Sequence, residues 1–531
     1  MIKKSIFILS FVSGLLLSLP WMLDGCCWVL FFAFVPLFFA ELLIEKAYLK
    51  PAFLIYFRST LPAFFIWNIC STWWIAHVSL VGMLLITLLN ALLMSTVWCL
   101  RYLVKRRFGE VTAFFSLPVF WLTFEFLHYN WSVQWPWLNL GNGFANAVEL
   151  IQWFEYTGVL GGSLWVLLSN ILIFLLIQGL RGKSFSNSLK IAVCLVFLIG
   201  VPLIWSLYRY SSYQEEGSSI EVLVLQPNID PYTQKFSTWS PGKQVEKLVQ
   251  LAQSSNLKST DLIVAPETAL PEMWEDSVFV QNSQLKPLFK LFETNPTVRI
   301  ISGAFTLKRY GDNDVFSETA RRSEDGKYLY DIFNSALLVD SSSNLQIGHK
   351  SILVSGVEKM PFQKYISFLN RFILQIGGSG GSLGMAKEPT LFYGKDAVKI
   401  GPIICFESVF GEYVGKSVRK GAEVLVVLTN DGWWKSSPGG KQHFSYSCIR
   451  AVETRRSIVR CANTGISGFI NQRGDVVKKS RLNTTDILTS SVYLNDQFTF
   501  YTRNGDYLGR VAACLSAMIL LYYIGNSCWK W

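Results

Sequence analysis

The chain has 531 residues, of which 51% are hydrophobic and only 16% are charged, whereas a soluble globular protein carries about 25% charged residues. This shortage of charge argues against an ordinary cytosolic enzyme, and the apolar composition excludes intrinsic disorder. The formal net charge is +11, but the basic residues of the first half lie in short clusters between apolar segments, such as 105–107. Such clusters are typical of membrane topology signals, so we expect no nucleic-acid partner.

Charged residues are unevenly distributed along the chain. Residues 1–210 contain 20 of the 85 charged residues, so charge is about twice as frequent in the rest of the chain. We therefore predict a transmembrane region of seven helices at 1–210, a soluble domain at 211–507 and a C-terminal transmembrane helix at 508–531. Eight apolar runs are long enough to cross a bilayer: 5–22, 28–45, 52–76, 80–103, 111–128, 159–180, 190–208 and 508–526.

The residues that flank these runs predict how the chain crosses the membrane. Lysines or arginines follow the second, fourth and sixth runs, whereas the connections 77–79 and 129–158 contain neither. The positive-inside rule then places both termini in the cytoplasm and residues 209–507 outside it. The first run also resembles a signal peptide, but another apolar run follows at once, so we predict a retained helix.

The loop at 129–158 is unusually rich in aromatic residues. One interpretation is an ordinary aromatic belt at the membrane interface. The other is a wall for lipid chains beneath the outer domain. The sequence alone does not choose between them.

The soluble region alternates between short β-branched runs and helical patterns, which predicts an α/β sandwich or layered α/β domain. The glycine-rich run at 377–382 is expected to be a flexible insertion, and it does not match a dinucleotide-binding fingerprint. The four histidines and ten cysteines show no metal-ligand spacing, so we expect neither a metal nor a cofactor. Strands are predicted at 220–225, 262–265, 298–302, 336–339, 398–404, 424–428 and 468–470, and helices at 243–254 and 442–455.

Three reactive residues follow predicted strands, at the strand ends where ligands collect in open α/β sheets. Glu267 comes directly after 262–265, Lys350 follows 336–339 and a turn, and Cys405 ends 398–404. Taken singly, they are more typical of an exposed carboxylate, a surface lysine and an inert buried cysteine. A helix that begins at Cys405 would lower the pKa of its thiol. Together they would supply a base, a cation for a developing oxyanion and a nucleophile.

Three motifs occur in a characteristic order: Pro-Glu-Thr at 266–268, Lys-x-x-Leu-Val at 350–354 and Cys-Phe-Glu at 405–407. They resemble the Glu-Lys-Cys triad of the nitrilase superfamily, and Asn-Asp-Gly-Trp-Trp at 430–434 resembles its later signature. A nitrilase-like domain between seven membrane segments and one more is similar to a single family, the apolipoprotein N-acyltransferases of Gram-negative bacteria. The resemblance covers nearly the whole chain and implies an αββα sandwich inserted in a polytopic membrane protein.

The chain departs from the family pattern at three places. Ser-Gly-Val at 355–357 replaces the usual Pro-Phe-Gly, Phe406 stands where tyrosine is usual, and Phe236 replaces a tryptophan. These differences concern the substrate loops and leave the three triad positions in place.

The resemblance implies a two-step acyl transfer. Glu267 would deprotonate Cys405, the thiolate would attack the sn-1 ester of a phospholipid, and Lys350 would stabilise the oxyanion. The α-amine of the diacylglyceryl-cysteine of an apolipoprotein would then attack the thioester, on the periplasmic side of the bacterial inner membrane. Four residues are expected to support the triad or to position the substrate: Glu358, Phe406, Glu407 and Trp433.

Two other interpretations stay open. The same triad would serve a membrane-anchored hydrolase of amides or nitriles, with water as the second nucleophile, although eight spans are a large anchor for that purpose. The other interpretation is a non-enzymatic protein, either a transporter or a lipid-binding scaffold. A transporter usually has more ionisable residues inside its spans than the three candidates found here, Glu41, Arg58 and Glu125.

Overall fold

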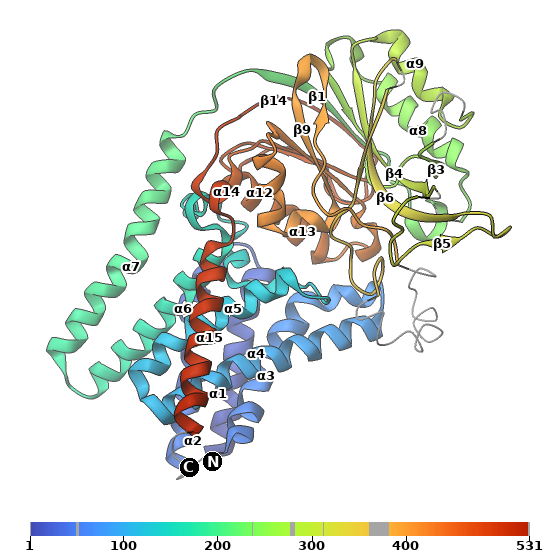
Figure 1. Ribbon diagram of the computed structural model, residues 1–531. Coiled ribbons are helices and arrows are strands. Elements are labelled where there is room, and N and C mark those ends of the chain that lie inside the picture. The colour runs from blue at the N-terminus through green and yellow to red at the C-terminus, as the bar shows by residue number, and fades with distance from the viewer. Residues whose placement is uncertain are drawn as a thin grey trace. The chain divides into compact units, whose positions relative to one another are not determined.

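The computed structural model describes residues 2–48, 52–235, 237–276, 282–311, 313–342, 344–360 and 382–528 (Figure 1). The chain forms two compact units. One, here called the membrane unit, comprises Met1–Tyr213 and Asn504–Trp531, and the other, the α/β unit, comprises Gln214–Arg503. Phe236 and residues 377–381 of the glycine-rich run lie outside the described residues.

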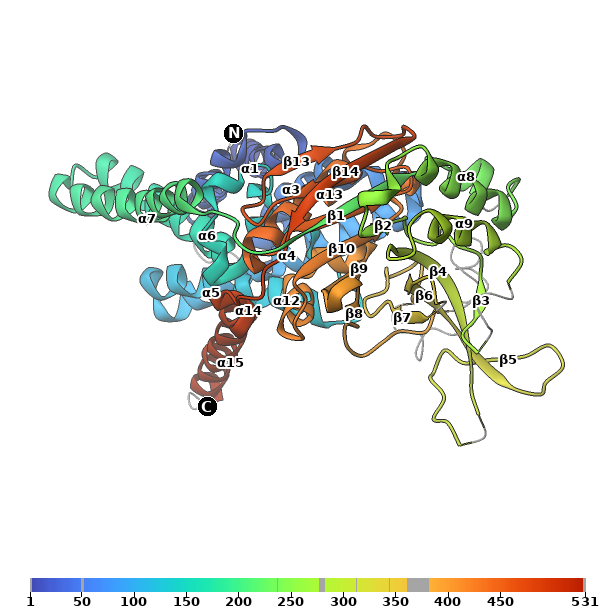
Figure 2. The same cartoon turned by 90° about the horizontal axis from the view of Figure 1, so that it is seen from above.

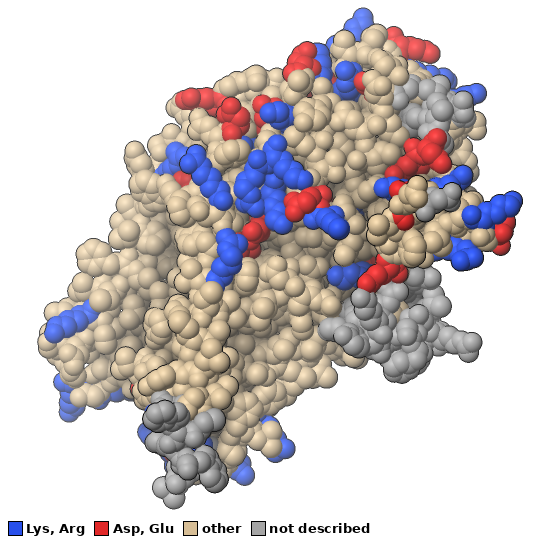
Figure 3. All heavy atoms as spheres, viewed as in Figure 1, with Lys and Arg blue, Asp and Glu red and all other residues tan. Residues whose placement is uncertain are grey.

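The membrane unit is built from long apolar helices. Within the described residues, eight helical segments are long and apolar enough to cross a bilayer, which confirms the eight predicted spans and makes the chain a multi-pass membrane protein. In Figure 3 the charged side chains gather mainly over the α/β unit on the face shown. The helices are α1 (Ile2–Met22), α2 (Val35–Ala47, after a 3-10 turn at Cys27–Phe31), α3 (Phe53–Thr72), α4 (Leu80–Phe108), α5 (Glu110–Asn130), α6 (Phe154–Arg181), α7 (Phe185–Ser212) and α15 (Tyr507–Cys528).

Ion pairs join several charged side chains within the described part of the membrane unit. Arg101 on α4 contacts Glu41 on α2 and lies 3.1 Å from Glu110 at the start of α5. Lys105, one turn further along α4, lies 2.7 Å from Glu45 and 2.6 Å from Glu110. Because an unpaired charge in a bilayer is costly, these ion pairs explain how α2, α4 and α5 keep charged side chains among apolar ones.

The aromatic loop before α6 packs into the membrane unit. Trp137 and Phe144 are fully buried, so these two rings belong to the core and form neither a lipid-facing wall nor an interfacial belt. Glu125 on α5 anchors the loop, because its carboxylate accepts hydrogen bonds from the Leu140 N–H at 2.8 Å and from the Trp121 indole at 3.0 Å. The loop contains three 3-10 turns, Pro136–Leu138, Leu140–Phe144 and Val148–Leu150.

Two sheets make up the α/β unit (Figures 1 and 2). The first sheet has the order β14 (Asp486–Tyr493), β1 (Ser219–Gln226), β2 (Leu262–Val264), β4 (Arg299–Arg309), β6 (Leu329–Val339) and β5 (Arg321–Arg322), with β3 (Met273–Trp274) beside β4 and β7 (Leu345–His349) beside β6. The second has the order β13 (Val476–Lys479), β12 (Gly468–Ile470), β11 (Ile458–Ala462), β10 (Val424–Thr429), β9 (Lys399–Ile404) and β8 (Phe392–Tyr393).

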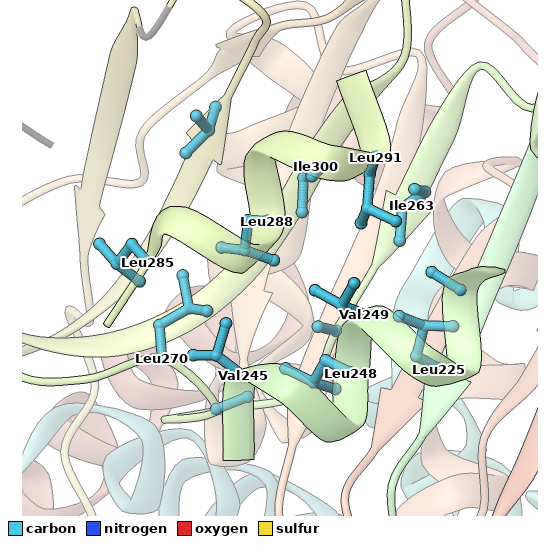
Figure 4. Close-up of a cluster of buried hydrophobic side chains, with 14 of the residues drawn as sticks. Leu225, Val245, Leu248, Val249, Ile263, Leu270, Leu285, Leu288, Leu291 and Ile300 are labelled. Carbon is cyan, nitrogen blue, oxygen red and sulfur yellow. The ribbon is translucent and has the colours of Figure 1, made fainter. Parts of the chain in front are cut away.

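The sheets pack face to face through apolar side chains that alternate along the strands. Val224 and Val264 of the first sheet share one buried cluster with Ile404 and Val426 of the second. The outer face of the first sheet carries α8 (Pro241–Gln253) and α9 (Lys286–Thr294), whose leucines pack on it (Figure 4). On the second sheet, α12 (Gly411–Arg419) contacts β9, and α13 (Pro438–Thr454) contacts β12. The unit is therefore the αββα sandwich that the resemblance implied.

Strand direction places two connections at the carboxyl ends of parallel strands. β1, β2 and β4 are mutually parallel, as are β9, β10 and β11. The carboxyl ends of parallel strands meet at one edge of a sheet. The segments after β2 and β9 leave from such edges and carry Glu267 and Cys405.

Candidate active site

The structure brings the three predicted reactive residues together. The Lys350 ammonium lies 3.3 Å from Glu267 Oε1 and 2.9 Å from Glu358 Oε1. The Cys405 thiol lies close enough to Glu267 and Lys350 for the charges of both to shift its pKa. Lys350 follows β7, a strand that the sequence analysis did not predict, in a hairpin with β6.

Lys350 is buried as a cation. Its side chain is fully shielded from solvent. Burial opposes its charge, but the carboxylates of Glu358 and Glu267 hold the pKa of Lys350 well above its ordinary value. The amine therefore stays protonated at neutral pH, so it can stabilise negative charge but cannot act as a base.

Asn334 on β6 is a site residue that the sequence analysis missed. Its Nδ2 donates to Glu267 Oε1 at 2.8 Å and to Glu358 Oε1 at 3.0 Å. Its main-chain carbonyl oxygen accepts the main-chain N–H of Lys350 at 2.8 Å. Asn334 and Lys350 thus both bridge the two carboxylates. An amide can hold a carboxylate at a defined angle without adding charge, so this asparagine fixes the proposed base.

Glu407 links the backbones of two site segments. Its Oε1 accepts the N–H groups of Ser351 at 2.6 Å and Ile352 at 3.3 Å, and its Oε2 accepts that of Ile404 at 2.7 Å. Burial raises the pKa of Glu407 to about 7. The carboxyl group therefore ties the segment after Lys350 to the strand before the cysteine.

Cys405 occupies a sharp turn at the end of β9. Its φ is +52°, in the left-handed region that side chains other than glycine seldom adopt. The helix that begins there, Cys405–Val409, is only a short 3-10 turn. The expectation that it would lower the pKa of the thiol is wrong. Desolvation and then the charge of Glu267 raise the pKa of Cys405, and Lys350 opposes them only in part. The resting thiol is protonated and needs a base.

A second buried lysine, Lys235, also escaped the sequence analysis. Its Nζ donates to the Glu267 carbonyl at 3.0 Å and to Thr268 Oγ1 at 2.6 Å. Burial lowers the pKa of Lys235 to about 8. It lies in a π-helical turn, Pro231–Lys235, and holds the backbone turn that carries the proposed base. No sequence spacing links a lysine at this position to Glu267, so only the fold reveals the contact.

Two predicted supporting residues pack on other partners. The Phe406 ring is buried and meets Phe410 edge-on, with 5.1 Å between ring centres. The Trp433 ring lies 5.4 Å from that of Tyr232, whose hydroxyl donates to the Trp433 carbonyl at 3.0 Å. Of the four predicted supporting residues, Glu358 contacts the triad directly, Glu407 acts on its backbone, and these two aromatic residues shape the surroundings.

The chain is similar to known proteins along most of its length. The family described as apolipoprotein N-acyltransferase N-terminal domain matches residues 13–172, and the carbon-nitrogen hydrolase family matches residues 222–497. The chain is 28% identical to an apolipoprotein N-acyltransferase of Chlorobaculum tepidum, covering 97% of this chain and 96% of that one. It is 30% identical to one of Geobacter metallireducens, covering 95% and 92%. Among solved structures, an amidase from Nesterenkonia sp. aligns with a TM-score of 0.37 and 12% identity over 56% of this chain and 98% of the amidase.

Proposed function

Because the chain belongs to the apolipoprotein N-acyltransferase family, it is an N-acyltransferase of lipoprotein maturation, and we propose that a phospholipid is its acyl donor. The acceptor is the α-amino group of an N-terminal diacylglyceryl-cysteine. The acyl chain passes through a thioester on Cys405. One observation carries this proposal: a protonated thiol, a carboxylate and a buried cation converge at the ends of β9, β2 and β7.

In the first half-reaction, Glu267 takes the proton of the Cys405 thiol as the sulfur attacks the sn-1 ester carbonyl. The carbonyl oxygen becomes an oxyanion, which the Lys350 ammonium and the Phe406 backbone N–H stabilise. The ester C–O bond then breaks. Glu267 returns the proton to the leaving alkoxide, so lysophospholipid departs and a thioester remains.

In the second half-reaction, the neutral α-amine of the acceptor attacks the thioester carbonyl. Glu267 accepts a proton from the attacking nitrogen, and the same cation and N–H stabilise the second oxyanion. The C–S bond breaks, the thiolate regains its proton from Glu267, and the product is an amide. The direction is favourable because an amide is more stable than a thioester.

The buried charges suit this division of work. Lys350 sits between two carboxylates, and desolvation together with the charge of Glu267 keeps the resting thiol protonated. When the oxyanion forms, the cation is already in place and no solvent has to reorganise. Glu358 and Asn334 position Glu267 and Lys350, and Glu407 positions the backbone on either side of them.

The membrane unit accounts for the choice of substrates. Donor and acceptor are both acylated, and each buried methylene group contributes about 0.8 kcal/mol, so a soluble enzyme would have to extract a whole chain from the bilayer. We place the α/β unit on the periplasmic side of the inner membrane. Basic residues follow the second, fourth and sixth spans, whereas the connections 77–79 and 129–158, which follow the third and fifth spans, contain none.

The deciding experiment uses the purified full-length protein and a phospholipid with a labelled sn-1 chain. Intact mass should increase by one acyl group, lysophospholipid should be released, and a diacylglyceryl-cysteine peptide should then discharge the enzyme as an amide. If the enzyme shows no acyl adduct but releases ammonia from amides, it is a membrane-anchored hydrolase. Absence of both reactions would refute the acyl-transfer proposal.

A further inference from the structure

A chain of buried polar side chains lies directly behind the proposed nucleophile. It runs from Ser408 through His443 and Asp431 to Arg460, here called the His443 relay. All four side chains are at most 2% exposed. They come from separate elements: the 3-10 turn after β9, helix α13, the turn after β10, and strand β11. Four polar side chains are buried together only when they satisfy one another, so the relay is a built feature of the site.

The relay ends on the main-chain carbonyl of Cys405. Ser408 Oγ donates to this oxygen at 2.8 Å, and His443 Nε2 lies 3.1 Å from it. At the other end, Arg460 Nη2 lies 2.9 Å from Asp431 Oδ2 and 2.9 Å from His443 Nδ1. A carbonyl oxygen has two lone pairs, and both have a partner here.

The contact with the Cys405 carbonyl specifies the imidazole tautomer that it needs. A carbonyl oxygen can only accept, so His443 Nε2 must carry the proton to bond to it. Nδ1 then accepts from Arg460 Nη2 at 2.9 Å, although Asp431 Oδ1 lies equally close to that nitrogen, and Ser408 Oγ lies 3.0 Å from Nε2. Burial and the charge of Arg460 hold the pKa of His443 below its ordinary value, which favours this neutral form.

The planar peptide bond carries this contact to the reaction centre. A trans peptide holds its C=O and the following N–H in one plane and in opposite directions. Fixing the Cys405 carbonyl therefore fixes the N–H of Phe406, which the proposed mechanism uses for the oxyanion. Hydrogen bonds to a carbonyl also polarise the peptide and strengthen its N–H as a donor. The positive φ of Cys405 makes this peptide one that has to be held by its surroundings.

We propose that His443 is a positioning residue for acyl transfer, which orients and polarises the Cys405–Phe406 peptide through its bond to the Cys405 carbonyl. Ser408 shares this role, and Asp431 and Arg460 hold the imidazole in the required tautomer and orientation. The inference rests on the proposed function, because the oxyanion that the peptide serves arises in that reaction.

The test separates the rate of acylation from the amount of competent enzyme. His443→Gln places an amide N–H close to the position of Nε2, His443→Met removes the donor, and Ser445→Ala at a partly exposed position on the same helix is the matched control. Each full-length variant is acylated in a single turnover by a phospholipid with a labelled sn-1 chain and, separately, by p-nitrophenyl butyrate. The rate constant and the amplitude of the burst are recorded.

We expect His443→Met to slow both reactions by roughly ten- to a hundred-fold at unchanged amplitude, since misaligning an oxyanion donor costs less than removing one. His443→Gln should recover most of the rate, and Ser445→Ala should match the wild type. A wild-type rate constant in His443→Met, or a loss confined to amplitude, overturns the proposal, because a purely structural role would act only on amplitude. Failure of His443→Gln to rescue overturns it as well.

A second variant covers the case in which His443→Met does not fold. Ser408→Ala removes the other donor to the same carbonyl, and a slower burst at full amplitude supports the proposal, whereas a wild-type rate contradicts it. The use of two acyl donors, phospholipid and p-nitrophenyl butyrate, also separates this inference from the proposed function. If the wild type is acylated by p-nitrophenyl butyrate but not by phospholipid, the proposal that phospholipid is the acyl donor is wrong. The rate constants of the variants with p-nitrophenyl butyrate still decide the role of His443.

Discussion

Replacing Lys350 with methionine should do more than remove one oxyanion ligand. The ammonium lies 2.9 Å from Glu358 and 3.3 Å from Glu267, so its loss leaves two carboxylates facing one another in a buried site. Loss of an oxyanion donor costs about 2.7–4 kcal/mol, or roughly a hundred- to a thousand-fold in the rate of acylation. Breaking a buried ion pair costs roughly a further 3–5 kcal/mol unless the freed charge is neutralised.

Proton uptake by one of the two carboxylates is the simplest way to neutralise the freed charge. At an effective dielectric constant of about 20, a contact near 3 Å is worth roughly 5 kcal/mol, several times the roughly 1.4 kcal/mol that corresponds to one pH unit. One carboxyl group of Lys350→Met should therefore hold a proton at neutral pH. In a plot of the acylation rate against pH, the rise at low pH (the acid limb) should move to higher pH by at least about one unit. The rate on the high-pH plateau should stay roughly a hundred- to a thousand-fold below that of the wild type.

The double variant Lys350→Met, Glu358→Gln separates the two effects, because it restores the net charge of the site without restoring the cation. Its acid limb should return to the wild-type position while its plateau remains low. The assay is single-turnover thioester formation from about pH 5.5 to about pH 9, with Lys327→Met, an exposed lysine paired with Asp325, as the matched control. A plateau at the wild-type level in Lys350→Met would falsify the oxyanion role.

Three further outcomes can be checked directly. Cys405→Ser should form no thioester, whereas Cys448→Ser should retain the wild-type rate because Cys448 is a buried packing residue on α13; intact mass after exposure to phospholipid distinguishes them. A reporter active only in the periplasm should be on when fused near Gln214 and off near Lys183, and the reverse pattern would contradict the predicted topology. The folded state holds the Glu407 carboxyl with its pKa raised to about 7, so it binds the proton more tightly than the unfolded chain does. The resulting contribution to the free energy of unfolding, up to about 3 kcal/mol, is fully present below the ordinary carboxyl pKa and is lost as the pH rises to about 7. Glu407→Gln should accordingly reduce the difference in melting temperature between about pH 5 and about pH 7.5, and an unchanged difference would refute this account of the carboxyl group.

The elements with the strongest apolar patterns could be predicted from the sequence. The spans are long apolar runs, and the seven predicted strands overlap β1, β2, β4, β6, β9, β10 and β12, although β4 and β6 are more than twice as long as predicted. β11 escaped prediction because Arg460 interrupts its apolar run, and this arginine can be buried only because Asp431, which follows a different strand, neutralises it. β14 escaped because its sequence, Asp-Ile-Leu-Thr-Ser-Ser-Val-Tyr, neither alternates strictly nor forms an apolar run.

The candidate active site, too, could be predicted from the sequence only in part. The order of Glu267, Lys350 and Cys405 is visible along the chain, because each follows a strand that could be recognised or lies close to one. Asn334 sits inside β6, and nothing in its neighbourhood indicates that its amide reaches a carboxylate 67 positions earlier. The direction of the Cys405 pKa shift was likewise hidden, because it depends on how near Glu267 comes and how little water remains, and neither is a local property.

The pairing of β1 with β14 has a consequence for how this protein is made. The two strands pair at every position from Ser219 opposite Tyr493 to Gln226 opposite Asp486, so the first sheet cannot close its edge until residue 493 has emerged, roughly 270 residues after β1. During that interval β1 presents unpaired backbone groups, which are a template for aggregation, and pairing over so long a separation is slow. Biogenesis must shield this edge while the rest of the α/β unit is synthesised. A chain cut short before β14 would contain every proposed catalytic residue and still lack the finished sheet that holds them.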